Sequence, residues 1–211
     1  MATELHRAVT VRGLTRSFDG RAVVDGLDLS LVAGQFTALL GSGGSGRSTL
    51  LRVLAGLDRE VSGTVLVPRR RALVARAPRL ASWRRVWRGA PPGPPGQRVT
   101  LAQALARDPD LLLLDDPFGS LDARAASAAR GRVREWWERG GRTVLLVTDD
   151  VDEALLLADR VLVLRGGGIA YDTPVALDRP RSPADPAFAA RRVRLLAELG
   201  AVADSPVPRA A

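Results

Sequence analysis

Gly41-Ser-Gly-Gly-Ser-Gly-Arg-Ser-Thr49 is the stretch that decides the fold. It follows the apolar run Phe36–Leu40 and leads into Ser48–Ala55, where leucine and valine recur at helical spacing. A glycine-rich loop between a strand and a helix lets backbone N–H groups converge on phosphate oxygens, at the positive end of the helix dipole. The stretch therefore predicts a phosphate-binding loop in which the Ser48 hydroxyl ligates Mg²⁺. The alternative is an ordinary glycine turn, because residue 47 is Arg where the motif asks for Lys.

A second motif favours the phosphate loop over the turn. Asp115 and Asp116 follow the leucine run Leu111–Leu114 and precede Pro-Phe-Gly-Ser-Leu-Asp122. In an open α/β sheet, ligands bind at the carboxyl ends of the buried strands, which is where this pattern places the two carboxylates. Asp115 can hold Mg²⁺ through water, and Asp116 can orient an attacking water.

The rest of the chain alternates between strand and helix patterns. Short apolar runs between Val9 and Leu31, broken by Gly13, Gly20 and Gly26, are typical of antiparallel strands and turns. The later pattern predicts buried parallel strands at 111–114, 144–147 and 161–164, helices at 122–139 and 150–158, and a helical end at 183–199. The expected fold class is α/β, with a mainly parallel sheet covered by helices on both faces and an N-terminal antiparallel portion.

Composition excludes several classes of protein. Aliphatic runs are far shorter than the ~18 residues of a membrane span, and there is no cysteine for disulfides or thiol catalysis. We expect a cytoplasmic chain without a secretory signal. The basic residues are all arginine, and 61–107 holds ten of them without a carboxylate. That Arg-rich segment either grips an anionic surface or is a solvated stretch that has drifted toward arginine; nucleic acid is not an expected partner.

Together these motifs resemble the ATP-binding subunits of ABC transporters, in particular importers of nitrate, aliphatic sulfonates and taurine. The resemblance covers nearly the whole chain and rests on GLTRSFDGRAVVDGLDLSLVAGQFTALLG, LARDPDLLLLDDPFGSLDA and LLVTDDVDEALLLADRVLVL. It implies a P-loop NTPase fold of the ABC class, with ATP and Mg²⁺ as cofactors. It also implies membrane-spanning permease subunits and a second ATP-binding subunit as partners, at the inner face of the cell membrane.

The resemblance also implies roles for individual residues. Nucleotide binding falls to Phe18, where the family has the aromatic that stacks on adenine, and to Gly41, Ser42, Gly43, Gly44, Ser45, Gly46, Arg47, Ser48 and Thr49. Ser48 and Asp115 match the Mg²⁺ positions, and Asp122 matches an aspartate at the dimer interface. Asp116 and Asp149 occupy the catalytic positions.

The chain departs from the family at these reactive positions. Arg47 replaces the lysine, Arg76 the glutamine near Mg²⁺, Asp116 the glutamate and Asp149 the histidine beside the γ-phosphate. Shortening glutamate to aspartate draws a carboxylate back by roughly 1 Å, which can cost about 10²-fold in rate. An anion at Asp149 would face phosphate unless Arg47 or Arg76 neutralises it.

The segment that should carry the signature sequence is also altered. Counting back from the predicted helix 97–106 places Pro91-Pro-Gly-Pro-Pro95 there, and proline has no N–H to donate. Only 14 residues separate Arg76 from Pro91, so the family's helical subdomain is predicted to be largely missing. We expect one nucleotide-binding domain over 1–204, with a shortened Pro/Arg-rich linker at 77–96, and a flexible tail at 205–211.

The hypothesis that follows is ATP binding with strongly impaired hydrolysis in an importer subunit of the nitrate, sulfonate or taurine type. The alternatives are a non-catalytic interaction protein on an ABC scaffold and a decaying paralogue.

Overall fold

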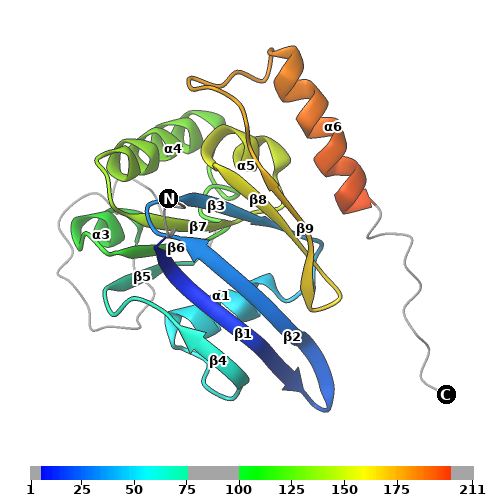
Figure 1. Cartoon of the computed structure of the whole chain (residues 1–211). Coiled ribbons are helices and arrows are strands. Elements are labelled where there is room, and N and C mark those ends of the chain that lie inside the picture. Colours follow the sequence, from blue (N-terminus) through cyan, green and yellow to red (C-terminus); the bar gives the residue numbers. More distant parts are fainter. Residues whose placement is uncertain (1–5, 76–99, 201–211) are drawn as a thin grey trace, which may run out of the picture.

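The structure is a computed structural model that describes residues 6–75 and 100–200 (Figure 1). A three-stranded sheet contains β1 (Arg7–Phe18), β2 (Arg21–Val32) and β4 (Ser62–Leu66). A six-stranded sheet contains β3 (Phe36–Leu40), β5 (Arg71–Val74), β6 (Leu111–Asp115), β7 (Thr143–Val147), β8 (Arg160–Arg165) and β9 (Gly168–Pro174). The helices are α1 (Arg47–Ala55), α3 (Leu101–Ala106), α4 (Ala123–Glu138), α5 (Val151–Leu157) and α6 (Pro186–Gly200).

The six-stranded sheet has the order β5-β6-β7-β3-β8-β9 and is parallel except for β9, which pairs antiparallel with β8. Its central strands are apolar along their length because both faces of the sheet are covered. All five residues of β3 are buried, as are Leu111–Leu114 of β6. The strands that we predicted at 111–114, 144–147 and 161–164 are confirmed.

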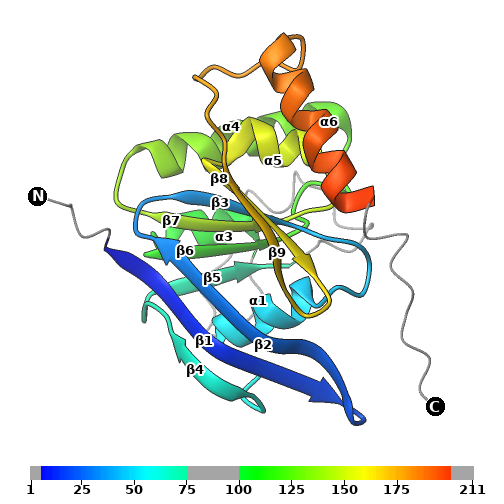
Figure 2. The ribbon, with the colours of Figure 1, turned by 45° about the vertical axis from the view of Figure 1, so that its right-hand side comes forward.

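Side chains alternate between the two faces of this sheet. Leu112 and Leu114 of β6 pack in a core with α3, α4, α5 and α6, whereas Leu111 and Leu113 pack in a second core with α1 and the three-stranded sheet. Figures 1 and 2 both show α4, α5 and α6 on one side of the sheet and α1 with β1, β2 and β4 on the other. Within the described ranges, no helix is long and apolar enough to cross a membrane.

The N-terminal antiparallel portion has fewer turns than we predicted. Gly20 lies in the turn between β1 and β2, but Gly13 and Gly26 lie inside these strands, so turns at those two positions were a wrong prediction. Both have positive φ, and the strand register shifts next to Gly13. There Gly13 N donates to Asp28 Oδ1 at 2.7 Å, and Gly26 N donates to Thr15 Oγ1 at 2.9 Å. Glycine bends the strand at a β-bulge without ending it.

Side-chain caps fix where the helices begin. Asp122 caps α4 and Asp150 caps α5, so the predicted helices are confirmed with boundaries one residue inside 122–139 and 150–158. Thr100 forms a capping box with Gln103, so α3 starts at Leu101 rather than at residue 97. The linker at 77–96, the proline-rich stretch within it and the tail at 205–211 lie outside the described residues.

Candidate functional site

Three neighbouring strands bring the candidate segments to one edge of the sheet. β7 lies between β6 and β3, and all three run parallel. The loop 41–46 follows β3, Asp115 ends β6 and Asp116 comes directly after it, and Thr148 and Asp149 follow β7. Because parallel strands end at the same edge, segments more than a hundred residues apart in sequence meet where an α/β sheet binds its ligands.

The loop after β3 depends on its glycines. Gly46 has φ 99° and precedes α1 as its N-cap, and a Cβ there would lie 2.7 Å from the Val23 carbonyl oxygen. At Gly41, a Cβ would lie 2.7 Å from Ser45 Oγ and 2.8 Å from the Leu164 carbonyl oxygen. The loop therefore packs closely against the backbone of β2 and β8. Together with Val23 it lines a hollow of about 190 Å³ at the start of α1. Such a loop at a helix N-terminus is chemically suited to phosphate.

The side chains of Ser48 and Asp115 meet beside this hollow. Ser48 Oγ donates to Asp115 Oδ1 at 3.3 Å. Burial, and then the charge of Asp116, raise the pKa of Asp115, while the Ser48 hydrogen bond and Arg47 oppose that shift. Within the described residues, no group of three or more His, Cys, Asp or Glu could hold a metal ion. One carboxylate and one hydroxyl are the kind of set that holds Mg²⁺ together with substrate phosphates and water.

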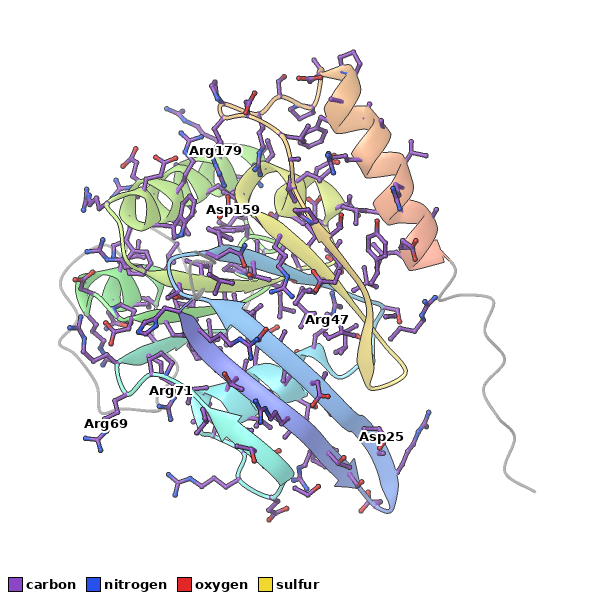
Figure 3. All side chains as sticks on the ribbon, viewed as in Figure 1. Asp25, Arg47, Arg69, Arg71, Asp159 and Arg179 are labelled. Carbon is purple, nitrogen blue, oxygen red and sulfur yellow. The ribbon has the colours of Figure 1, made fainter. Side chains whose placement is uncertain are left out.

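Arg47 reaches across the site toward the end of β7. Its Nη1 donates to the Thr148 carbonyl oxygen at 2.6 Å, and its Cδ would lie 3.3 Å from a Cβ placed on Gly41. Figure 3 labels this side chain at the start of α1. Burial lowers the pKa of Arg47, and the charges of Asp149, Asp115 and Asp116 oppose that shift. The charge of Asp149 thus favours the cationic form of Arg47, and the neutralisation of Asp149 that we considered from sequence stays a prediction.

Thr148, Glu153 and Arg130 form a network that the sequence reasoning missed. The buried Thr148 Oγ1 donates to Glu153 Oε2 at 3.0 Å, and Glu153 Oε1 accepts from Arg130 Nη1 at 3.1 Å. Burial raises the pKa of Glu153, although both hydrogen bonds lower it. The available signal was Glu153 itself, a carboxylate directly before the apolar stretch Ala154–Ala158 of the predicted helix, because a charge on a buried helix face requires partners.

Asp116 and Asp122 are held by local backbone geometry. Asp116 has φ 44°, and its N donates to the Val147 carbonyl oxygen at 2.8 Å. Its carboxylate lies against Gly119, where a Cβ would be 2.4 Å from Oδ1. Asp122 Oδ1 accepts from Ala125 N at 2.8 Å at the start of α4. Asp116 follows the metal-ligand candidate directly, whereas Asp122 is an exposed helix cap.

Phe18 is not among the residues that line the hollow. It ends β1 with 42% of its surface exposed, and the Arg16 guanidinium lies 4.2 Å from its ring centroid. Arg16 is itself held by Asp58 at 2.9 Å and Glu60 at 3.0 Å. The structure thus brings 41–49, Asp115, Asp116 and Asp149 together at the ends of β3, β6 and β7, and the role of Phe18 beside adenine stays a prediction. Arg76 lies outside the described ranges.

Comparisons with known proteins decide the family. A family model described as ABC transporter matches residues 24–87. Aliphatic sulfonates import ATP-binding protein SsuB 1 of Streptomyces avermitilis is 52% identical over 231 residues, which cover 94% of this chain and 89% of the relative. SsuB 2 of Paracoccus denitrificans is 49% identical, covering 95% of this chain and 97% of the relative. The chain belongs to the ABC transporter ATP-binding family.

Solved structures show the same fold. A nucleotide-free ATP-binding cassette from an ABC transporter matches with a TM-score of 0.69 at 15% identity, covering 94% of this chain and 98% of that one. The ATP-binding subunit of an ABC transporter matches with a TM-score of 0.65 at 20% identity, covering 92% and 98%. The predicted P-loop NTPase fold of the ABC class is confirmed.

This ABC cassette is shorter than its Streptomyces relative in the aligned region. The alignment runs over 231 positions, more than the 211 residues of the whole chain, so the relative has residues without a counterpart here. That the helical subdomain is the missing part concerns 77–96, beyond the residues that the structure describes, and stays a prediction.

Proposed function

We propose that this cassette is the ATP-binding subunit of an importer for aliphatic sulfonates and that it binds Mg²⁺ and ATP with strongly reduced hydrolysis. The sulfonate class is supported by the names of the two relatives at about 50% identity. The role requires membrane-spanning permease subunits and a second ATP-binding subunit, with the cassette on the cytoplasmic face of the cell membrane.

The observation that carries nucleotide binding is the Ser48–Asp115 pair beside the glycine loop. In this proposal the backbone N–H groups of 41–49 hold the phosphates, with the α1 dipole behind them. Ser48 and Asp115 would hold Mg²⁺, which neutralises phosphate charge when bound.

Reduced hydrolysis is supported by the residues around the reacting phosphate. In this proposal Asp116 is the group that orients the attacking water, yet its carboxylate rests against Gly119 and is one methylene shorter than glutamate. Asp149 adds a negative charge where the family has a histidine, which opposes charge development on phosphate. Arg47 interacts with that charge through a guanidinium already bonded to Thr148.

The binding proposal is tested by equilibrium ATP titration with and without Mg²⁺. We expect Mg²⁺ to tighten binding by about tenfold, the effect of one charge-assisted contact of ~1.4 kcal/mol, and Ser48→Ala to abolish that gain. Ser62→Ala is the control, since it removes an exposed hydroxyl from β4 and leaves the glycine loop unchanged. Equal Mg²⁺ dependence in Ser48→Ala and the unchanged protein would refute the assigned metal position.

The transport proposal is tested in cells of the source organism. Deleting the gene should prevent growth on ethanesulfonate as the only sulfur source and leave growth on sulfate intact. A reintroduced Ser48→Ala gene should fail to restore growth, whereas Ser62→Ala should restore it. Restoration by Ser48→Ala would show that sulfonate use does not depend on the Mg²⁺ position assigned to Ser48.

A further inference from the structure

A second hollow, of about 260 Å³, lies between α4, the end of α5 and the segment that precedes α6. Four arginines and one hydroxyl dominate its lining: Ser127, Arg130, Arg134, Arg179 and Arg181. None of the described residues that line it is acidic. We call it the arginine hollow. It lies on the face of the six-stranded sheet that α4 and α5 cover, whereas the glycine loop leads into α1 on the opposite face.

One wall of the arginine hollow is a single face of α4. Ser127, Arg130 and Arg134 are spaced i, i+3 and i+7, so they project from one side of the helix. Arg134 forms a long ion pair along α4, with its Nε 3.7 Å from Glu138 Oε1; among the described residues that Nε has no hydrogen-bond partner, and the side chain is 42% exposed. Ser127 is also exposed. Both side chains therefore have hydrogen-bonding capacity left for a ligand.

The opposite wall holds two arginines in fixed positions. Arg181 donates to four backbone carbonyl oxygens, those of Leu155, Ala158, Val175 and Leu177. Arg179 donates to the Leu157 carbonyl oxygen at 2.7 Å and to Asp159 Oδ1 at 2.8 Å, and Figure 3 shows it beside Asp159. Guanidinium groups that are already ordered lose little conformational freedom when an anion binds.

The positive charge of the hollow is only partly neutralised. Arg130 has Glu153 and Arg179 has Asp159, each about 3 Å away, and Arg134 has Glu138 at 3.7 Å. In the part of the chain that the structure describes, no carboxylate lies within 4.0 Å of Arg181. Burial, followed by the charge of Arg179, lowers the pKa of Arg181 to about 10, so it stays cationic at neutral pH. An anion in the hollow would offset the repulsion between Arg179 and Arg181.

We propose that the arginine hollow is a binding site for one tetrahedral oxyanion, of the kind that phosphate, sulfate and a sulfonate head group share. Arg134, Arg130 and Ser127 contact the anion, since a planar guanidinium pairs with two oxygens of such a group. Arg179 and Arg181 supply a positive field from the opposite wall. The hollow shares no lining residue with the glycine-loop hollow, although Arg130 also bonds to Glu153 in the network at the end of β7.

The test is a ¹⁵N–¹H NMR titration of the full chain with sodium phosphate, sodium sulfate and sodium ethanesulfonate in turn, at constant ionic strength. Constant ionic strength removes general screening effects. The Gly131 amide, which lines the hollow, reports this site, and the amides of 41–49 report the glycine loop independently. We expect saturable shifts at Gly131, and the anion that saturates it at the lowest concentration identifies the source of the oxyanion.

Two variants and a control locate the contact. Arg134→Gln should weaken binding at Gly131 by tenfold or more, and Ser127→Ala should weaken it a few fold, both with dispersed spectra that report an intact fold. Arg139→Gln is the matched control, because this exposed arginine at the end of α4 does not line the hollow. Chemical-shift changes at Gly131 that rise linearly with concentration for all three salts would overturn the proposal. An equal loss of anion affinity in Arg134→Gln and Arg139→Gln would also overturn it.

Discussion

The guanidinium of Arg47 donates a 2.6 Å hydrogen bond to the carbonyl oxygen of Thr148, across 101 residues of sequence. The bond joins the first residue of α1 to the end of β7 and holds a cation near Asp149. A lysine at this position would be a compact point charge rather than a planar fork. The substitution of lysine by arginine therefore changes which groups the loop cation contacts before any nucleotide binds.

Arg47→Lys should tighten ATP binding by about tenfold, or ~1.4 kcal/mol. An arginine that turns to phosphate must first give up its bond to Thr148, whereas a lysine is free of that contact. Equilibrium titration of ATP into the purified protein measures the effect. Arg52→Lys, at the other end of the same helix, is the control and should leave the affinity unchanged. Weaker binding by Arg47→Lys would contradict this reading of the hydrogen bond.

Gly46→Ala should destabilise the fold by about 2 kcal/mol or more. The residue has φ 99°, and a Cβ would lie 2.7 Å from the backbone oxygen of Val23, so both conformation and contact oppose a side chain. Gly131→Ala is the matched control: it lies within α4 with no atom within 4 Å of a Cβ, and should gain about 0.5–1 kcal/mol. Urea unfolding measures both, and equal effects would show that the loop tolerates a Cβ.

Glu153 should make stability depend on pH. Burial raises the pKa of Glu153 in the folded state above the usual 4.5, so the folded state binds its proton more tightly than the unfolded state. The free energy of unfolding attributable to this residue therefore falls as pH rises from about 4.5 through the raised value. The stability of the unchanged protein relative to Glu153→Gln should decline across that interval in urea unfolding at stepped pH.

A surface change provides the comparison for that experiment. Glu135→Gln removes one carboxylate from the exposed side of α4 and controls for the change in net charge. A stability difference between the unchanged protein and Glu153→Gln that stays constant, or grows, as pH rises would contradict the assigned direction of the shift.

Much of the fold follows from local patterns in the sequence. Runs such as Leu111–Leu114 are apolar throughout because both faces of their sheet are covered. Such a run clearly predicts a buried strand when glycine, proline or carboxylates flank it. β5 and β9 escaped prediction because they lie at the edges of the sheet, and an edge strand such as β9 alternates between half-buried and exposed residues. The predicted turns at Gly13 and Gly26 were wrong because the sequence alone does not distinguish a glycine that bends a strand from one that ends it.

The candidate site was likewise predictable in part. The loop 41–49 and Asp115 are predictable because their spacing is local and set by phosphate and Mg²⁺ chemistry. The contacts that distinguish this chain are not local: Arg47 with Thr148, and Arg130 with Glu153, each join different elements. Only the strand order β6-β7-β3 brings the first pair together, and no pattern within one segment encodes it.

The most direct test of the central claim is ATP binding followed by phosphate release on one purified sample with Mg²⁺ present. We predict saturable ATP binding with phosphate release at least about 10²-fold below that of the Paracoccus denitrificans relative measured alongside, the cost of a carboxylate displaced by roughly 1 Å. Turnover equal to that of the relative, and abolished by Asp116→Ala, would contradict the account by showing that the altered residues still support catalysis.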